Sequence, residues 1–73
     1  KRTNLAGDWY LFDTARGIVS GNDPYLLLNS TSAENGNYDA IDPLSSGFTL
    51  ASGSSYIDGL NASGSTYIFL AIA

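Results

Sequence analysis

The C-terminal stretch, residues 66–73, constrains the fold more than any other part of the chain. It reads TYIFLAIA, with Tyr67 and Phe69 on one alternating face. Ile68 and Leu70 occupy the other face, so neither face is polar. A strand with two apolar faces is normally covered on both sides. The pattern therefore predicts a buried strand, with the rest of the chain acting as its cover.

The segments upstream predict further short strands and almost no helix. Strand signals occur at residues 8–13, 25–29, 47–51 and 56–57. Gly, Ser, Asn and Pro interrupt every other stretch, and no helical period with caps is sustained over ten or more residues. We therefore expect an all-β fold, and the strand signals leave a sandwich and a partial barrel equally open. Its predicted core is Trp9, Leu11, Phe48, Leu50, Tyr67, Ile68, Phe69 and Leu70.

Three turn signals refine this expectation. Asp23 precedes Pro24 and should be extended, leading into the strand at 25–29. The Asn35-Gly36 dipeptide predicts a hairpin turn. Pro43 excludes its segment from the centre of a sheet.

The length of the chain predicts one small domain that needs support from outside. A chain of 73 residues forms one module, 1–73, and domains of this size bury only about 60% of their unfolded surface. The chain has no Cys for disulfides and no His for a zinc site. It also has no Met, so we expect the C-terminal part of a longer protein, completed by further chain or by neighbouring subunits.

Charge and hydropathy exclude two classes of partner. The formal charge is -4, with only three Lys and Arg residues, whereas nucleic-acid binding needs clustered cations. The longest apolar run is far shorter than the ~20 residues of a membrane-spanning helix. We therefore expect no nucleic acid and no membrane insertion.

The absence of His and Cys also removes most catalytic chemistry. No triad, thiol nucleophile or imidazole metal ligand can form within this chain. A glycosidase pair could come from the acidic residues, and Asp39 with Asp42 could supply calcium ligands. Acidic residues beside Gly, Asn and Pro are more often turn formers. We predict no enzyme, no catalytic or metal-binding residue and no cofactor; the acidic candidates are Glu34, Asp39, Asp42 and Asp58.

A few residues are candidates for ligand contact. Asp13 and Arg16 should form a charge-assisted contact that fixes the turn between them, with a ligand-binding role for Arg16 as the alternative. Trp9, Tyr10 and Tyr25 could stack on sugar rings, although aromatic residues inside apolar strands are more often core. The candidate ligand contacts are Tyr10, Arg16 and Tyr25.

An ordered set of motifs runs along nearly the whole chain. In sequence they are Lys1-Arg2, Gly7-Asp8-Trp9, Asp13 with Arg16, residues 26–29, Glu34, Asp42, residues 46–50, Asn61, Ser63-Gly64, Tyr67-Ile68, Ala71 and Ala73. Together they resemble the β-rich modules of virion appendage proteins in tailed bacteriophages. The most specific parts are the SGF strand and the NxSGxxYI ending. In that family an apolar strand normally precedes the Lys-Arg pair.

The resemblance implies a small antiparallel β-sandwich, jelly-roll-like in form. It also implies that this sandwich is a non-enzymatic virion structural module in a tail fibre, appendage or capsid decoration. Its implied partners are other virion proteins and further copies of itself as a homo-oligomer, a trimer among the expected forms. A host-surface glycan is a further expected partner, and the implied location is the extracellular virion. The alternative hypothesis is a carbohydrate-binding β-sandwich module of a secreted bacterial protein.

Overall fold

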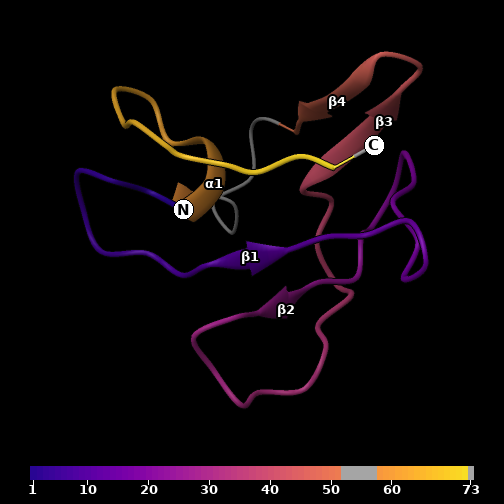
Figure 1. Ribbon diagram of the computed structural model, residues 1–73, viewed down its shortest axis with the longest axis horizontal. Coiled ribbons are helices and arrows are strands. Elements are labelled where there is room, and N and C mark those ends of the chain that lie inside the picture. The colour runs from indigo at the N-terminus through magenta and orange to yellow at the C-terminus, as the bar shows by residue number, and fades with distance from the viewer. Residues whose placement is uncertain (52–57, 73) are drawn as a thin grey trace.

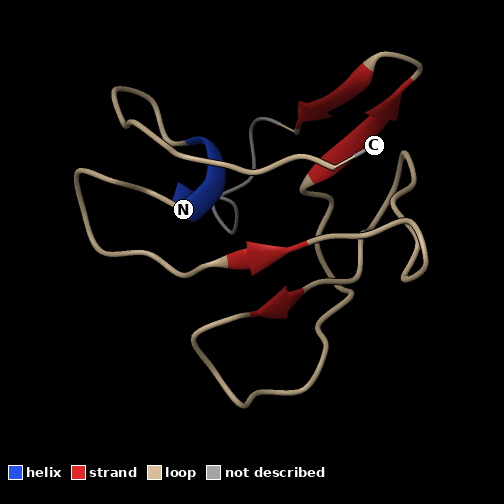
Figure 2. Ribbon diagram, viewed as in Figure 1, coloured by secondary structure: helices blue, strands red, loops and turns tan. Residues whose placement is uncertain are grey.

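The computed structural model describes residues 1–51 and 58–72 (Figure 1). These residues include four short strands and one short helix, which Figure 2 shows joined by long loops. They are β1 (Tyr10–Leu11), β2 (Leu26–Leu27), β3 (Ile41–Leu44), β4 (Gly47–Leu50) and α1 (Asp58–Asn61). The strands form two antiparallel pairs, β1 with β2 and β3 with β4. The predicted sheet-rich, helix-poor class is confirmed; the strand predicted at 56–57 lies outside the described residues.

The first sheet joins two of the predicted apolar segments. Tyr10 of β1 lies opposite Leu27 of β2. The backbone N–H of Leu28 donates to the carbonyl of Trp9 at 2.9 Å, which continues the pairing by one residue. Residues that oppose each other across an antiparallel pair share a face. Trp9 and Leu28 therefore lie on one face, and Tyr10 with Leu27 on the other.

The second sheet is a hairpin with a two-residue loop at Ser45 and Ser46. Gly47 follows the loop with a φ of 153°, a conformation that residues with a Cβ rarely adopt. Pro43 lies within β3, opposite Phe48. A proline is tolerated here because both strands of a two-stranded sheet are edges. The sequence argument that kept Pro43 out of a central strand is consistent with this position.

The hairpin turn predicted at Asn35-Gly36 is wrong. Asn35 instead forms an antiparallel bridge with Tyr25, and their backbones exchange hydrogen bonds of 2.8 and 3.1 Å. An Asn-Gly hairpin turn requires positive φ at both residues, and Gly36 is not among the glycines with positive φ. Pairing with Tyr25 holds this segment extended, and the hairpin forms at Ser45-Ser46 instead.

A buried carboxylate organises the centre of the fold. Asp23 is fully buried, with an exposed fraction of 0%. Its Oδ1 accepts a hydrogen bond from the backbone N–H of Val19 at 3.0 Å. Its Oδ2 accepts hydrogen bonds from the N–H groups of Ala40 at 3.1 Å and Ile41 at 3.0 Å. Asp23 therefore connects the loop before β2 to the start of β3.

The predicted core is wrong for most of its members. Among the described residues, the buried apolar side chains are Ala40 and Ile41. Leu11, Leu50 and Tyr67 are half-buried. The other predicted core residues are exposed: Trp9, Phe48, Ile68, Phe69 and Leu70. The physical reason is that the described residues form two separate two-stranded sheets, with little packed over these five side chains.

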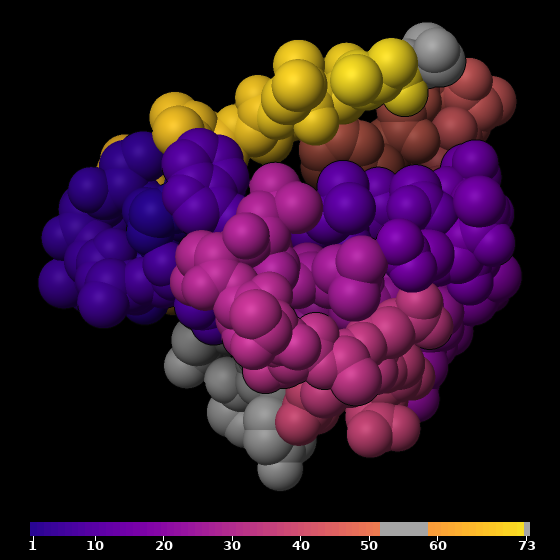
Figure 3. Space-filling model, turned by 60° about the horizontal axis from the view of Figure 1, so that its bottom comes forward, coloured from indigo at the N-terminus to yellow at the C-terminus, as the bar shows by residue number. Residues whose placement is uncertain are grey.

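Pairing of the terminal segment joins the two ends of the chain. Arg2 forms an antiparallel bridge with Tyr67. The backbone N–H of Ile68 donates to the carbonyl of Lys1 at 2.9 Å. In the described part of the chain, no backbone hydrogen bond reaches residues 69–72. Figure 3 shows this segment, in yellow, lying as a ridge along the outside of the molecule.

Candidate functional site

The first candidate surface is the terminal edge, defined here as residues 68–72. Its exposed fractions are 76% for Phe69 and 86% each for Leu70 and Ile72. Phe69 meets Phe48 of β4 edge to face, with ring centroids 5.6 Å apart. This single aromatic contact anchors the terminal edge to the β3–β4 hairpin. The other large side chains of the terminal edge remain open to solvent.

The terminal edge is comparable in area to the largest exposed apolar patch of an ordinary monomer. If each large apolar side chain offers roughly 150–250 Å², its four exposed members leave on the order of 500 Å² uncovered. The largest apolar patch on an ordinary monomer is about 300–600 Å² and is often functional. The terminal edge also has unpaired backbone groups, since its hydrogen bonding ends at Ile68 among the described residues. It can therefore pair with another strand while burying apolar side chains.

The second candidate is an aromatic cluster on one face of the first sheet. Tyr25 is its centre, with ring centroids 5.2 Å from Tyr10, 5.8 Å from Phe12 and 6.5 Å from Tyr38. A Cβ placed on Gly59 of α1 would lie 3.2 Å from the Tyr10 hydroxyl, so the helix packs closely on this ring. The predicted ligand contacts Tyr10 and Tyr25 thus lie together, half-buried and packed on each other.

Packing changes the acidity of both tyrosines. Burial raises the pKa of Tyr10 above its ordinary value of 10.0, and Tyr25, Asp8 and Tyr67 raise it further. Burial also raises the pKa of Tyr25 above 10.0, with added contributions from Tyr38 and Asp8. Both hydroxyls are therefore neutral at physiological pH. The cluster can offer aromatic rings and neutral hydroxyls, but no charge.

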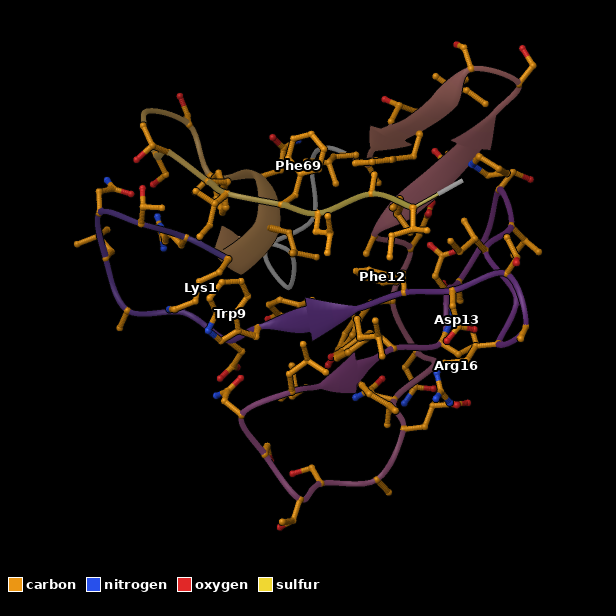
Figure 4. All side chains as sticks on the ribbon, viewed as in Figure 1. Lys1, Trp9, Phe12, Asp13, Arg16 and Phe69 are labelled. Atoms are coloured by element: carbon orange, nitrogen blue, oxygen red, sulfur yellow. The ribbon has the colours of Figure 1, made fainter. Side chains whose placement is uncertain are left out.

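The third candidate is the ion-pair group around Arg16. The carboxylate of Asp13 accepts the backbone N–H of Arg16 at 2.6 Å, and its Oδ2 lies 3.1 Å from Nε. Nη1 of Arg16 donates to Oε2 of Glu34 at 2.8 Å. The predicted contact between Asp13 and Arg16 is therefore confirmed, and Figure 4 shows the two side chains together at one end of the molecule. The guanidinium is paired with two carboxylates, although its buried Nε has no hydrogen-bond partner.

The sequence argument did not identify Glu34 as a partner of Arg16. The two residues are 18 positions apart, and they meet because Asn35 bridges Tyr25. That bridge could not be read from the sequence, where Asn35-Gly36 indicated a turn. The predicted ligand contacts are thus divided between the aromatic cluster and this ion-pair group.

The acidic candidates whose side chains the structure describes are Glu34, Asp39 and Asp42. Partial desolvation and the carboxylates of Asp42 and Asp23 raise the pKa of Asp39 above its ordinary value of 3.8, although Asp39 itself is exposed. Within residues 1–51 and 58–72, no group of three His, Cys, Asp or Glu residues could hold a metal ion. Glu34 is engaged with Arg16, and the side chain of Asp58 is outside the described part.

The last candidate lies where β1 begins, at Trp9. Trp9 is 40% exposed and Leu28, opposite it, is 64% exposed. The backbone N–H of Trp9 donates to Oδ1 of Asn29 at 2.8 Å, and Nδ2 of Asn29 donates to Oδ1 of Asp8 at 2.9 Å. A shallow surface hollow beside them is lined by residues 28–31. We call Asp8, Trp9, Leu28 and Asn29 the Trp9 platform.

Comparison with known proteins identifies the family but no activity. The model of a domain of unknown function, DUF7483, matches residues 1–73, so the chain belongs to that family. No curated protein and no solved structure matches the chain. Among the described residues, no helix is long and apolar enough to cross a membrane.

Proposed function

We propose that this member of the DUF7483 family is a non-enzymatic structural module of a phage virion. Its place is a tail fibre, an appendage or a capsid decoration, where it serves assembly and host-surface attachment. The two small sheets are parts of a jelly-roll-like β-sandwich that neighbouring subunits or further chain complete. The ordered motifs shared with virion appendage modules support this assignment.

The observation that carries the assembly role is the uncovered terminal edge. Phe69, Leu70 and Ile72 are all at least 76% exposed, and residues 66–72 contain no charged side chain. Edge strands of monomeric proteins are usually protected by charges, prolines or a covering element. Among the described residues, no charge, proline or covering element protects the terminal edge. The terminal edge is therefore suited to pairing with a strand of another chain.

The occupant that we assign to the terminal edge is a second copy of this chain. Two edges of on the order of 500 Å² bury about 1,000 Å² together, which is the approximate minimum area of a biological interface. Two uncharged strands can pair without electrostatic repulsion, and the paired backbones then form a continuous sheet. The same surface would serve each pair of neighbours in a symmetric oligomer.

Mass spectrometry of gradient-purified virions tests the location. The proposal predicts peptides of this chain in the intact particle fraction, at a stoichiometry comparable to other structural proteins. Peptides confined to the lysate, and missing from purified particles, would overturn the virion assignment.

The Trp9 platform supports a second candidate, a carbohydrate-binding module of a secreted bacterial protein. The indole of Trp9 is 40% exposed, and an exposed aromatic ring is a surface on which a sugar ring can stack. Mass spectrometry of the culture medium of uninfected cells separates the two candidates. A secreted bacterial module would be found in that medium, whereas a virion protein would not.

A further inference from the structure

Asn35-Gly36 is a reactive dipeptide, and neither of the roles proposed above uses it. It is the only place in the chain where glycine follows asparagine. Because glycine has no Cβ, its backbone nitrogen can approach the asparagine side chain closely. A bond forms from this nitrogen to Cγ of Asn35, the Cγ–Nδ2 bond breaks, and the amide proton of Gly36 leaves with Nδ2 as ammonia. Water then opens the resulting succinimide ring to aspartate or isoaspartate, and Gly36 is exposed to water.

The fold holds Asn35 in a conformation that opposes ring closure. The carbonyl of Asn35 accepts the N–H of Tyr25 at 2.8 Å, and its N–H donates to the Tyr25 carbonyl at 3.1 Å. Its Oδ1 accepts the N–H of Asn37 at 3.0 Å. Bringing the Gly36 nitrogen onto Cγ requires rotation about the Cα–C bond of Asn35, out of the extended conformation that strand pairing needs. That rotation turns the Asn35 carbonyl away from Tyr25, so the reaction requires the bridge to open.

The bridge between Tyr25 and Asn35 is a weak point of the fold. It is isolated, outside β1–β4, and it closes the wide loop that Figure 1 shows after β2. Residues 28–34 of this loop are all exposed. The Arg16–Glu34 ion pair beside the bridge has side chains 30% and 45% exposed, and surface ion pairs contribute little to stability. Segments with few buried contacts open locally at a lower cost than global unfolding, so the conformation that can react is populated without unfolding of the whole chain.

Isoaspartate at position 35 would prevent the bridge from closing again. In isoaspartate the chain runs through Cβ and Cγ, so it is longer by one atom, and the former main-chain carbonyl becomes a free carboxylate. That carbonyl is the acceptor of the Tyr25 N–H. We propose that Asn35-Gly36 is a self-modification site, at which opening of the Tyr25 bridge allows conversion to isoaspartate and the conversion then keeps the bridge open.

The experiment compares the rate of conversion in the folded and the unfolded chain. The intact chain is incubated in mildly alkaline buffer, with and without urea at a denaturing concentration. Peptide mass spectrometry measures the conversion of Asn35, and enzymatic methylation of isoaspartate identifies that product. We expect conversion to be about ten- to hundredfold slower in the folded chain, the protection that two backbone hydrogen bonds give. Hydrogen exchange of the Tyr25 amide should show protection of the same size, because both reactions need the same opening.

Two glycine variants test the chemistry. A Cβ on Gly36 would lie 3.9 Å from Cα of Pro24, an ordinary contact, and Gly36 is not among the glycines with positive φ. Gly36→Ala should therefore fold, and it should convert about tenfold more slowly in urea because its methyl group hinders the attacking nitrogen. Gly21 has no close neighbour either, so Gly21→Ala is the matched control and should convert as the unmodified chain does.

A third variant tests whether the bridge controls the rate. Glu34→Gln removes the ion pair with Arg16 next to the bridge, so Asn35 should convert about two- to fivefold faster in the folded chain. In urea its rate should equal that of the unmodified chain, because no bridge is left to open.

The purified isoaspartate form tests the consequence. Its Tyr25 amide should lose protection from hydrogen exchange, whereas the Ile41 amide, which donates to Asp23, should keep it. Three results would overturn the inference: equal conversion with and without urea, conversion of Gly36→Ala as fast as that of the unmodified chain, or an isoaspartate form in which the two amides keep or lose protection together. None of these results depends on whether the chain is found in virions, so failure here is distinct from failure of the proposed location.

Discussion

The carboxylate of Asp23 accepts a hydrogen bond from the backbone N–H of Ile41 at 3.0 Å, and both residues are buried. The same carboxylate also accepts the N–H groups of Ala40 and Val19. One side chain thus satisfies three backbone donors from two separate segments. A buried N–H group without an acceptor lowers the free energy of unfolding. Because the carboxylate of Asp23 is the acceptor for three such groups, it stabilises the fold by more than one ordinary hydrogen bond would.

Replacing Asp23 should therefore destabilise the fold strongly. Asp23→Ala leaves three backbone N–H groups without their acceptor and should cost about 3 kcal/mol or more of unfolding free energy. The neighbouring Asn22 is exposed, and Asn22→Ala should change stability by less than about 0.5 kcal/mol. Thermal and urea unfolding measure both. Equal stability of the two variants would show that the buried carboxylate is not central.

The backbone conformation after the hairpin loop predicts that Gly47→Ala lowers stability more than Gly21→Ala does. Gly47 has a φ of 153° with open space around it, so a Cβ would meet backbone strain and no neighbouring atom. Gly47→Ala should cost about 1–3 kcal/mol. Gly21 is equally open but is not among the glycines with positive φ, so Gly21→Ala should be neutral or slightly stabilising. Chemical denaturation checks the pair, and a Gly47→Ala variant as stable as Gly21→Ala would contradict the strain.

The two carboxylates that hold Arg16 should differ in importance. Glu34 pairs with Arg16 near solvent, with side chains 45% and 30% exposed, and Glu34→Gln should cost about 0.2–1 kcal/mol. Asp13 also accepts the backbone N–H of Arg16, so Asp13→Ala should cost about 1–2 kcal/mol more than Glu34→Gln. Unfolding free energies measured at low and at high salt show how much of each stability loss comes from the ion pair, because salt screens charge interactions. A larger loss from Glu34→Gln would contradict this assignment.

The aromatic cluster predicts loss of stability in alkali. The pKa of Tyr10 is raised above 10.0 by burial first and by nearby Tyr25, so the folded chain keeps this proton more tightly than the unfolded chain does. Stability should therefore fall as pH rises above the unfolded value of 10.0. Tyr10→Phe should flatten that fall, and the absorbance at the tyrosinate band should show one late-titrating group fewer. An unchanged alkaline titration would contradict the burial of Tyr10.

The sequence was informative where a local pattern matched a local structure. The predicted segments 8–13, 25–29 and 47–51 each contain a strand, namely β1, β2 and β4, although β1 and β2 are only two residues long. Asp13 contacts Arg16 as their spacing indicates. In each of these segments, the residue types that favour the structure also make its main contacts. Their prediction needed no knowledge of distant partners.

The sequence was misleading where a distant partner decides the structure. Asn35-Gly36 favours a turn, but pairing with Tyr25 holds it extended. For Asp23 the sequence predicted only an extended conformation before Pro24. Its burial depends on the N–H groups of Val19, Ala40 and Ile41, for which its carboxylate is the acceptor. An apolar strand pattern indicates burial without saying which chain provides the cover. For residues 68–72, the described part of this chain provides little of it.

Sedimentation velocity of the unmodified chain and of Leu70→Lys tests the central claim, that the terminal edge associates with a second copy. Leu5 is 60% exposed outside that edge, so Leu5→Lys is a control with the same change in charge. We predict oligomers at about 100 µM for the unmodified chain and for Leu5→Lys, but monomers for Leu70→Lys. A monomeric unmodified chain at that concentration, or oligomers that Leu70→Lys leaves intact, would contradict the claim.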